Sequence, residues 1–107
     1  MRVLFYQTSA GVSPVEKHLN GLPLEERATI AEALMAIEKN GIGEVDTRPI
    51  DGKLWEIRFP MQRIFYVLVA GPTLVLLHAY KKQSQKAPRR EIELALKRMR
   101  DVLAYGG

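Results

Sequence analysis

Residues 53–82 read KLWEIRFPMQRIFYVLVAGPTLVLLHAYKK, and the rest of the chain is organised around them. Turn signals at 60–62 and 71–72 divide this stretch into three apolar runs of strand length. Connections this short favour neighbouring antiparallel strands. The middle run is apolar on both faces, which is typical of a central strand, and alternation in the first run predicts that Trp55 lies in the core with Ile57 and Phe59. The stretch therefore predicts a three-stranded meander.

The flanking sequence adds one strand and three helices to this meander. Residues 2–7 read as a first strand, and Ser13 and Pro14 begin a helix that runs to about Asn20. Apolar residues at helical spacing predict further helices over roughly 24–39 and 89–104, with a short extended piece at 47–50 between them. The order β-α-α-β-β-β-α predicts a single α+β domain over residues 1–107, with two layers: helices packed on a largely antiparallel sheet.

Composition narrows the class of protein. The chain has 107 residues, 47% of them hydrophobic, and no cysteine, which excludes disulfides and zinc–thiolate sites. No apolar run reaches the length of about 18 residues that a membrane helix needs. With no signal-peptide pattern at the start, the chain is expected to be cytoplasmic, without a membrane partner.

Charge is divided unevenly along the chain. Residues 1–52 hold five Lys/Arg and eight Asp/Glu, whereas residues 53–107 hold eleven Lys/Arg and four Asp/Glu. A basic half of this kind suits a polyanion or an acidic protein, although an ordinary basic surface would look the same. Arg89 and Arg90 add a hint of an anionic partner, because they occupy the first helical turn, where the helix dipole disfavours cations.

Cations at the strand ends are the candidate site. Arg58, Arg63, Lys81 and Lys82 come from three adjacent predicted strands, and Arg63 is expected to be exposed because it directly follows a turn. Guanidinium groups bind phosphate oxygens bidentately and stabilise charge that develops on a phosphate. Crowded cations also favour a neutral lysine, which could accept the proton of a ribose 2′-hydroxyl. The chain has no phosphate-binding glycine loop and only scattered carboxylates, so we expect no cofactor and no metal.

Each of these residues also has an ordinary structural interpretation. Arg58 could pair with Glu56 on the same strand face, and His78 could be a hydrogen-bonded structural histidine rather than an acid or base. The apolar stripe of the last helix is expected to pack on the sheet.

The segments LWEIRF, QRIFYVL and LLHAYKKQSQKAPRREIELA resemble the RelE/ParE toxin superfamily, in particular its phage-derived HigB-like branch. The resemblance implies a type II toxin–antitoxin toxin that cuts mRNA on the ribosome and is neutralised by a helix-turn-helix antitoxin. Arg58 and Arg63 match basic residues of the second and third family strands, and Lys81 and Lys82 match the Lys-Arg pair after the fourth. Glu56 replaces a lysine of RelE, and the RelE tyrosine after the basic pair has no counterpart near Pro88.

The leading hypothesis is therefore a metal-independent endoribonuclease that works through the RNA 2′-hydroxyl. His78 or Tyr80 would supply the proton transfer that the missing tyrosine performs in RelE. Additional RNA-binding residues are expected to be Lys53, Tyr80, Lys86, Arg89 and Arg90. Two alternatives stay open: a ParE-like inhibitor of DNA gyrase that is not an enzyme, and an inactive family member.

Overall fold

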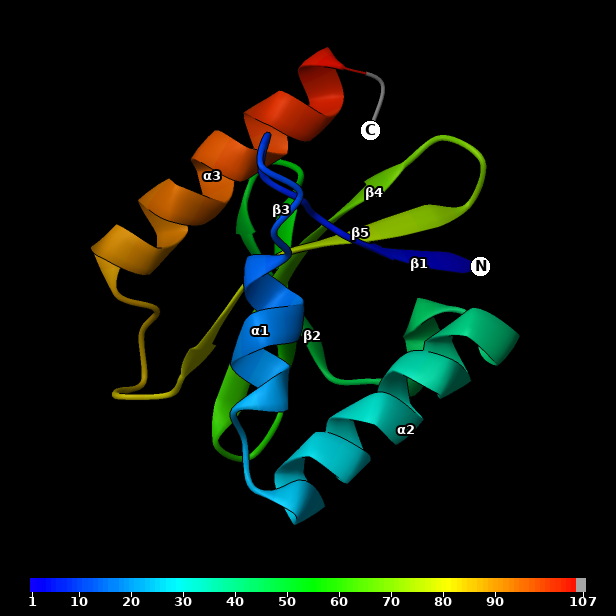
Figure 1. Ribbon diagram of the computed structural model, residues 1–107, viewed down its shortest axis with the longest axis vertical. Coiled ribbons are helices and arrows are strands. Elements are labelled where there is room, and N and C mark those ends of the chain that lie inside the picture. Colours follow the sequence, from blue (N-terminus) through cyan, green and yellow to red (C-terminus); the bar gives the residue numbers. More distant parts are fainter. Residues whose placement is uncertain (106–107) are drawn as a thin grey trace.

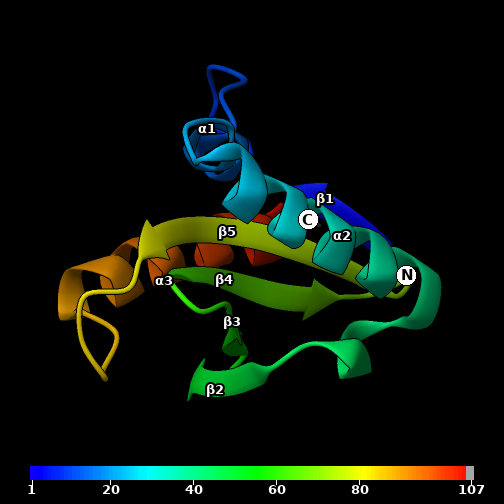
Figure 2. The same ribbon diagram turned by 90° about the horizontal axis from the view of Figure 1, so that it is seen from below.

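The structure is a computed structural model that describes residues 1–105. One five-stranded sheet carries three α-helices, with strand order β1-β5-β4-β3-β2 (Figures 1 and 2). The elements are β1 (Arg2–Phe5), α1 (Pro14–Asn20), α2 (Leu24–Asn40), the short 3₁₀ helix η1 (Ile42–Glu44), β2 (Thr47–Asp51), β3 (Leu54–Arg58), β4 (Gln62–Val69), β5 (Thr73–Lys81) and α3 (Arg89–Ala104). The α+β prediction is confirmed, and so are the helix boundaries to within one residue.

The sheet is antiparallel except at one edge. Strands β2 to β5 form an antiparallel meander, and β1 pairs with β5 in parallel. The tight β4–β5 turn passes through Gly71 at φ 76°, a backbone conformation that glycine adopts at little cost. The short extended piece expected at 47–50 is β2, a full edge strand of the sheet.

Helices cover both faces of the sheet. Val15, Leu19, Ile30, Leu34 and Ile37 of α1 and α2 pack on one face, which we call the α1–α2 face. Ala95 and Val102 of α3 pack on the other, the α3 face, against Phe65 and Val67 of β4. The sheet thus lies between two helical layers rather than under one. The reason is the central strand β4, which is apolar on both sides and needs cover on both.

Trp55 is not a core residue, contrary to expectation. It lies on the α1–α2 face opposite Pro49 of β2, and it is 37% exposed. Ile57 on the same strand face is fully buried. Alternation gave the correct face, but the helices do not extend to this end of β3, so Trp55 stays partly in solvent.

A β-bulge changes the alternation along β5. Phe65 pairs with His78 while the next residue, Tyr66, pairs with Leu76, so Leu77 is an extra residue on β5. Before the bulge Val75 packs on the α3 face, and after it Tyr80 does. Odd-numbered residues therefore point to the α3 face up to Leu77, and even-numbered ones do so beyond it.

Candidate functional site

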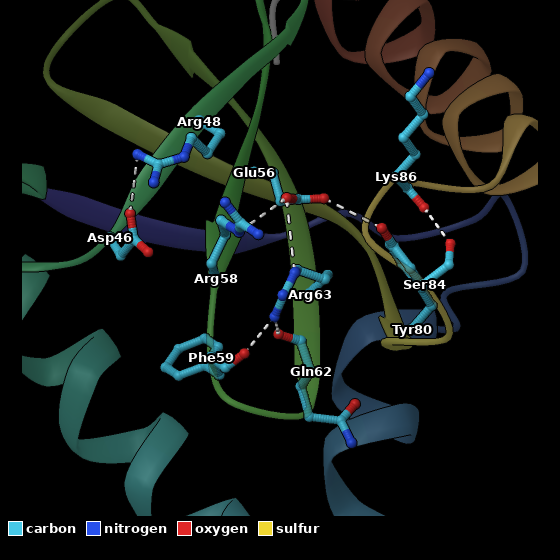
Figure 3. Close-up of polar contacts among 10 residues, drawn as sticks. All are labelled: Asp46, Arg48, Glu56, Arg58, Phe59, Gln62, Arg63, Tyr80, Ser84 and Lys86. Carbon is cyan, nitrogen blue, oxygen red and sulfur yellow. Dashed lines mark hydrogen bonds and ion pairs between the residues drawn. The ribbon is translucent and has the colours of Figure 1, made fainter.

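Strand register assembles the candidate site on the α3 face. Arg58 of β3 pairs with Arg63 of β4, which in turn pairs with Tyr80 of β5, so these three residues form one row across the sheet. Glu56 belongs to the neighbouring row and points into the same space (Figure 3). We call these four residues the Glu56 network.

The carboxylate of Glu56 is the centre of this network. Its Oε1 atom lies 3.9 Å from Nε of Arg58 and 3.8 Å from Nε of Arg63. Its Oε2 atom accepts a hydrogen bond of 3.1 Å from the Tyr80 hydroxyl. Because Glu56 is only 5% exposed, its charge is compensated inside the protein by two guanidinium groups rather than by water. The expected pairing of Arg58 with Glu56 is present, but as part of a larger cluster.

Tyr80 acts as a hydrogen-bond donor in this cluster. Burial raises the pKa of its hydroxyl well above the usual range, and the negative charge of Glu56 raises the pKa further. The hydroxyl therefore stays protonated at neutral pH and donates a hydrogen bond to Glu56. Tyr80 is also buried, so the structure places it beneath the surface and not on the solvent-facing surface that an RNA-binding role was expected to use.

Arg63 is buried, and the expectation that it is exposed after the turn is wrong. The side chain is directed inward on the α3 face, and the residue is 6% exposed. Its Nη1 atom donates hydrogen bonds to the carbonyl of Phe59 and, at 3.0 Å, to the carbonyl of Gln62. The guanidinium thus closes the β3–β4 turn while it also faces Glu56. Its first role in the fold is structural.

Arg58 is the accessible cation of the row. Its side chain is 26% exposed and makes one long ion pair, to Glu56. Lys82 follows β5 directly, and its backbone N–H donates to the carbonyl of Met61, which continues the ladder by one residue. By alternation from Tyr80, Lys82 belongs to the α3 face as Arg58 does. These two side chains are the solvent-facing charges next to the buried network.

Lys81 does not join them. It pairs with Gln62, whose side chain contacts His18 of α1 at 2.7 Å and Glu26 of α2 at 3.2 Å. Lys81 therefore shares the α1–α2 face, and the expected convergence of all four cations is wrong for this residue. The bulge at Leu77 is the physical reason, because without it alternation would place Lys81 on the α3 face.

His78 fastens α3 to the sheet. Its Nε2 atom lies 2.5 Å from Oε1 of Glu91, and Nη1 of Arg98 lies 3.1 Å from its Nδ1 atom. A guanidinium can only donate, so Nδ1 is the acceptor and Nε2 carries the proton that bonds to Glu91. Burial lowers the pKa of His78, and Glu91 opposes this shift. Both ring nitrogens are therefore occupied, which matches the structural interpretation of His78.

The sequence did not single out Glu91 and Arg98 as partners of His78. The two residues lie seven positions apart in α3, which puts them on one helix face, and Arg98 also donates to the Leu77 carbonyl at 3.0 Å. The spacing predicts that Glu91 and Arg98 share a helix face, but it does not predict that this face lies over His78 of β5.

The remaining expected RNA-binding residues are exposed. Arg89 pairs with Glu93 at 3.3 Å, and Arg90 approaches Glu91 at 3.9 Å. Lys86 lies in the β5–α3 loop, where its carbonyl accepts from the Ser84 hydroxyl at 2.8 Å, and its amine points away from Glu56 (Figure 3). Lys53 precedes β3, about 16 Å from Arg58 along an extended strand, so it is remote from the row.

Within residues 1–105, no group of three or more His, Asp or Glu side chains is arranged to hold a metal ion. Over the same residues, no helix has both the length and the apolar character required to cross a bilayer.

A search of curated proteins returned no match. A sequence family described as "Phage derived protein Gp49-like" matches residues 17–100, which includes the whole Glu56 network. The chain therefore belongs to the Gp49-like family of phage-derived proteins, a RelE-like family associated with toxin–antitoxin systems.

Proposed function

We propose that this chain is the toxin of a type II toxin–antitoxin system of the HigB-like branch, and that it cleaves mRNA bound to the ribosome. A helix-turn-helix antitoxin would neutralise it. The observation that supports the proposal is the partly exposed Arg58 of β3, which lies 3.9 Å from Glu56 and beside the buried Arg63 of β4. Lys82 follows β5, the next strand of the sheet after β4.

In this proposal the two accessible cations act on the scissile phosphate. The ribose 2′-hydroxyl gives its proton to water and attacks the adjacent phosphorus, and the bond to the 5′-oxygen breaks. The 5′-oxygen takes a proton from water, so the products carry a 2′,3′-cyclic phosphate and a 5′-hydroxyl. Negative charge accumulates on the phosphate oxygens in between. Arg58 can contact two of these oxygens at once, and Lys82 adds a second positive charge, so both stabilise the transition state more than the ground state.

The buried members of the network have supporting roles. The Nε atom of Arg58 lies 3.9 Å from Glu56, so the two terminal nitrogens of the guanidinium would be the ones to contact phosphate. Arg63 balances the charge of Glu56 so that the carboxylate does not neutralise Arg58 fully. His78 positions α3, since neither ring nitrogen is free to exchange a proton with RNA.

The test is induced expression with growth arrest as the first readout and primer extension on cellular mRNA as the second. The parent should arrest growth and cut transcripts within translated frames, leaving 2′,3′-cyclic phosphate ends. Arg58→Ala should slow cleavage about a hundredfold, the usual effect of losing one transition-state contact worth on the order of 3 kcal/mol. Lys39→Ala, an exposed charge of α2, is the matched control and should behave as the parent.

Growth arrest with intact mRNA and stalled replication would refute the nuclease and favour gyrase inhibition. Normal growth with a folded, expressed parent protein would indicate an inactive family member. If Arg58→Ala folds and still cuts mRNA at the parental rate, the role assigned to Arg58 is wrong.

A further inference from the structure

Strand β2 adds an exposed ion pair to the α3 face, beside the Glu56 network. Arg48 of β2 lies opposite Glu56 of β3, and the N–H of Arg58 donates to the carbonyl of Asp46 at 2.8 Å. Residues that lie opposite each other on antiparallel strands share a sheet face, so Asp46 and Arg48 occupy the same face as Arg58. Figure 3 shows these side chains together, with the guanidinium of Arg48 turned toward Asp46.

This ion pair holds Arg48 only loosely. Nη1 of Arg48 lies 3.4 Å from Oδ1 of Asp46, and more than half of each side chain is exposed. Within residues 1–105, the Arg48 side chain makes no other hydrogen bond or ion pair. Exposed ion pairs contribute little to stability, because water screens both charges. An external anion can therefore replace Asp46 at Arg48 without disturbing the fold.

Glu56 does not need Arg48 as a counter-ion. Although the two residues lie opposite each other, the Glu56 carboxylate contacts the other members of its network instead, namely Arg58, Arg63 and Tyr80. Its charge is balanced there by two guanidinium groups. The fold therefore leaves Arg48 as a positive charge that faces solvent beside the candidate site.

The spacing of Arg48 and Arg58 suits two consecutive phosphates. Arg48 lies opposite Glu56, which precedes Arg58 by two residues, so the two arginines are diagonal neighbours. Diagonal neighbours on antiparallel strands lie about 7–8 Å apart. Neighbouring phosphates of a single RNA strand are separated by a similar distance, and each guanidinium can contact one of them bidentately. A strand whose scissile phosphate lies at Arg58 can therefore bring its next phosphate to Arg48.

We propose that Arg48 binds the RNA phosphate next to the scissile one, and that Asp46 is the internal anion which this phosphate replaces. The inference rests on the proposed function, which places the scissile phosphate at Arg58. Arg48 takes no part in bond cleavage: it binds the backbone and so sets the path of the RNA from β3 toward β2. Arg48 belongs to the acidic half of the sequence, residues 1–52, but strand pairing brings it to the basic site.

Short RNAs that cannot be cleaved separate binding from catalysis. The first probe is a trinucleotide with 2′-O-methyl riboses and two charged phosphates, and in the second probe one phosphate is replaced by an uncharged methylphosphonate. The methyl groups block attack by the 2′-oxygen, so binding is measured whether or not the protein is a nuclease. NMR titration at low salt gives the Kd of each probe, and the Nε–H signals of Arg48 and Arg58 report where the phosphates bind.

The parent should bind the two-phosphate probe about tenfold more tightly than the one-phosphate probe, because a second charge-assisted contact forms. Arg48→Ala should reduce this preference to less than about twofold, since only the contact at Arg58 is left. Asp46→Asn should strengthen binding of the two-phosphate probe about threefold, because phosphate no longer displaces a carboxylate. The matched control is Arg2→Ala, which removes an exposed arginine from β1 at the opposite edge of the sheet and should keep the parental preference.

An Arg48→Ala variant that keeps the parental preference would overturn the proposal and leave Arg48 with the ordinary role of a charge that protects an edge strand. Weaker binding by Asp46→Asn would refute the exchange of Asp46 for phosphate. The variant Arg58→Ala distinguishes this inference from the proposed function. If Arg58→Ala weakens binding and Arg48→Ala does not, only the assignment of Arg48 fails. If neither variant weakens binding, or the parent binds neither probe, the RNA site of the proposed function fails as well.

Discussion

Glu56 is a buried carboxylate that lies close to two guanidinium groups and accepts a hydrogen bond from one hydroxyl. RelE has a lysine at this position. Glu56 removes some positive charge from the site, and it lies within ion-pair distance of Arg58.

Neutralising this carboxylate should destabilise the fold. Glu56→Gln leaves Arg63 buried with a weaker partner, and we expect a loss of about 3 kcal/mol in the free energy of unfolding. The control is Glu93→Gln, which removes the partner of Arg89 in an exposed pair and should cost less than about 0.5 kcal/mol. Urea denaturation at pH 7 measures both. Equal losses in the two variants would show that the buried Glu56 stabilises the fold no more than the exposed Glu93 does.

Tyr80 should make stability depend on pH in the alkaline range. The pKa of its hydroxyl is raised in the folded protein, so the proton is held more tightly in the folded than in the unfolded state. This contribution is complete below the ordinary tyrosine pKa of about 10 and is lost as pH rises beyond it. Tyr80→Phe should therefore be less stable than the parent at pH 7, and the difference should shrink above about pH 10. A difference that stays constant from pH 7 to 11 would contradict the assigned hydrogen bond.

At the scale of elements, the sequence predicted what is local and missed what depends on register. The first and last helices were predicted well because caps and apolar spacing are local signals, and the Ser13 side chain does accept from the Glu16 amide at 3.3 Å. The Leu77 bulge is not local, since it is defined by the partner strand. That one extra residue determines which sheet face Lys81 occupies. The alternation of residues along the sequence does not show where such a bulge lies.

Burial of charged residues was the second kind of miss. Arg63 was expected at the surface because it follows a turn, yet three acceptors draw it inward. Two of those acceptors are backbone carbonyls, which a sequence pattern does not display. The two helical layers, in contrast, could have been predicted, because a central strand apolar on both sides requires cover on both.

The attachment of α3 to β5 should weaken in acid. Burial lowers the pKa of His78, and its environment includes Glu91, Arg98 and His18, of which only Glu91 favours the protonated form. A lowered pKa gives stability that is complete above about pH 6.5 and lost as pH falls through the folded-state value. Protonation also removes the Nδ1 acceptor that Arg98 uses.

Hydrogen exchange of α3 amides tests this attachment. After correction for the intrinsic rate, opening of α3 should become more frequent between pH 7 and pH 5, whereas exchange of β4 should change little. His78→Phe should remove the pH dependence, and His18→Asn, in α1, should preserve it. Opening of α3 that is independent of pH in the parent would rule out His78 as the attachment.

At the scale of the whole molecule, the uneven charge is the feature that selects a partner. Most of the basic half, residues 53–107, folds as β3 to β5 and α3, and it carries both the Glu56 network and the exposed arginines Arg89 and Arg90. A chain that binds phosphate groups through such side chains releases counterions, so its affinity falls steeply as salt is added. The acidic half, with α1 and α2, should contribute little to this binding.

Two double variants with the same change of charge separate these halves. Arg89→Glu with Arg90→Glu should weaken binding of a single-stranded RNA oligonucleotide and reduce the salt slope by about 1.4, at roughly 0.7 per lost phosphate contact. Lys17→Glu with Lys39→Glu changes two exposed lysines of α1 and α2 and should leave the slope unchanged. Fluorescence anisotropy between 50 and 300 mM salt gives both slopes. If the two doubles weaken binding equally, only the net charge matters, and Arg89 and Arg90 do not form part of an RNA-binding surface.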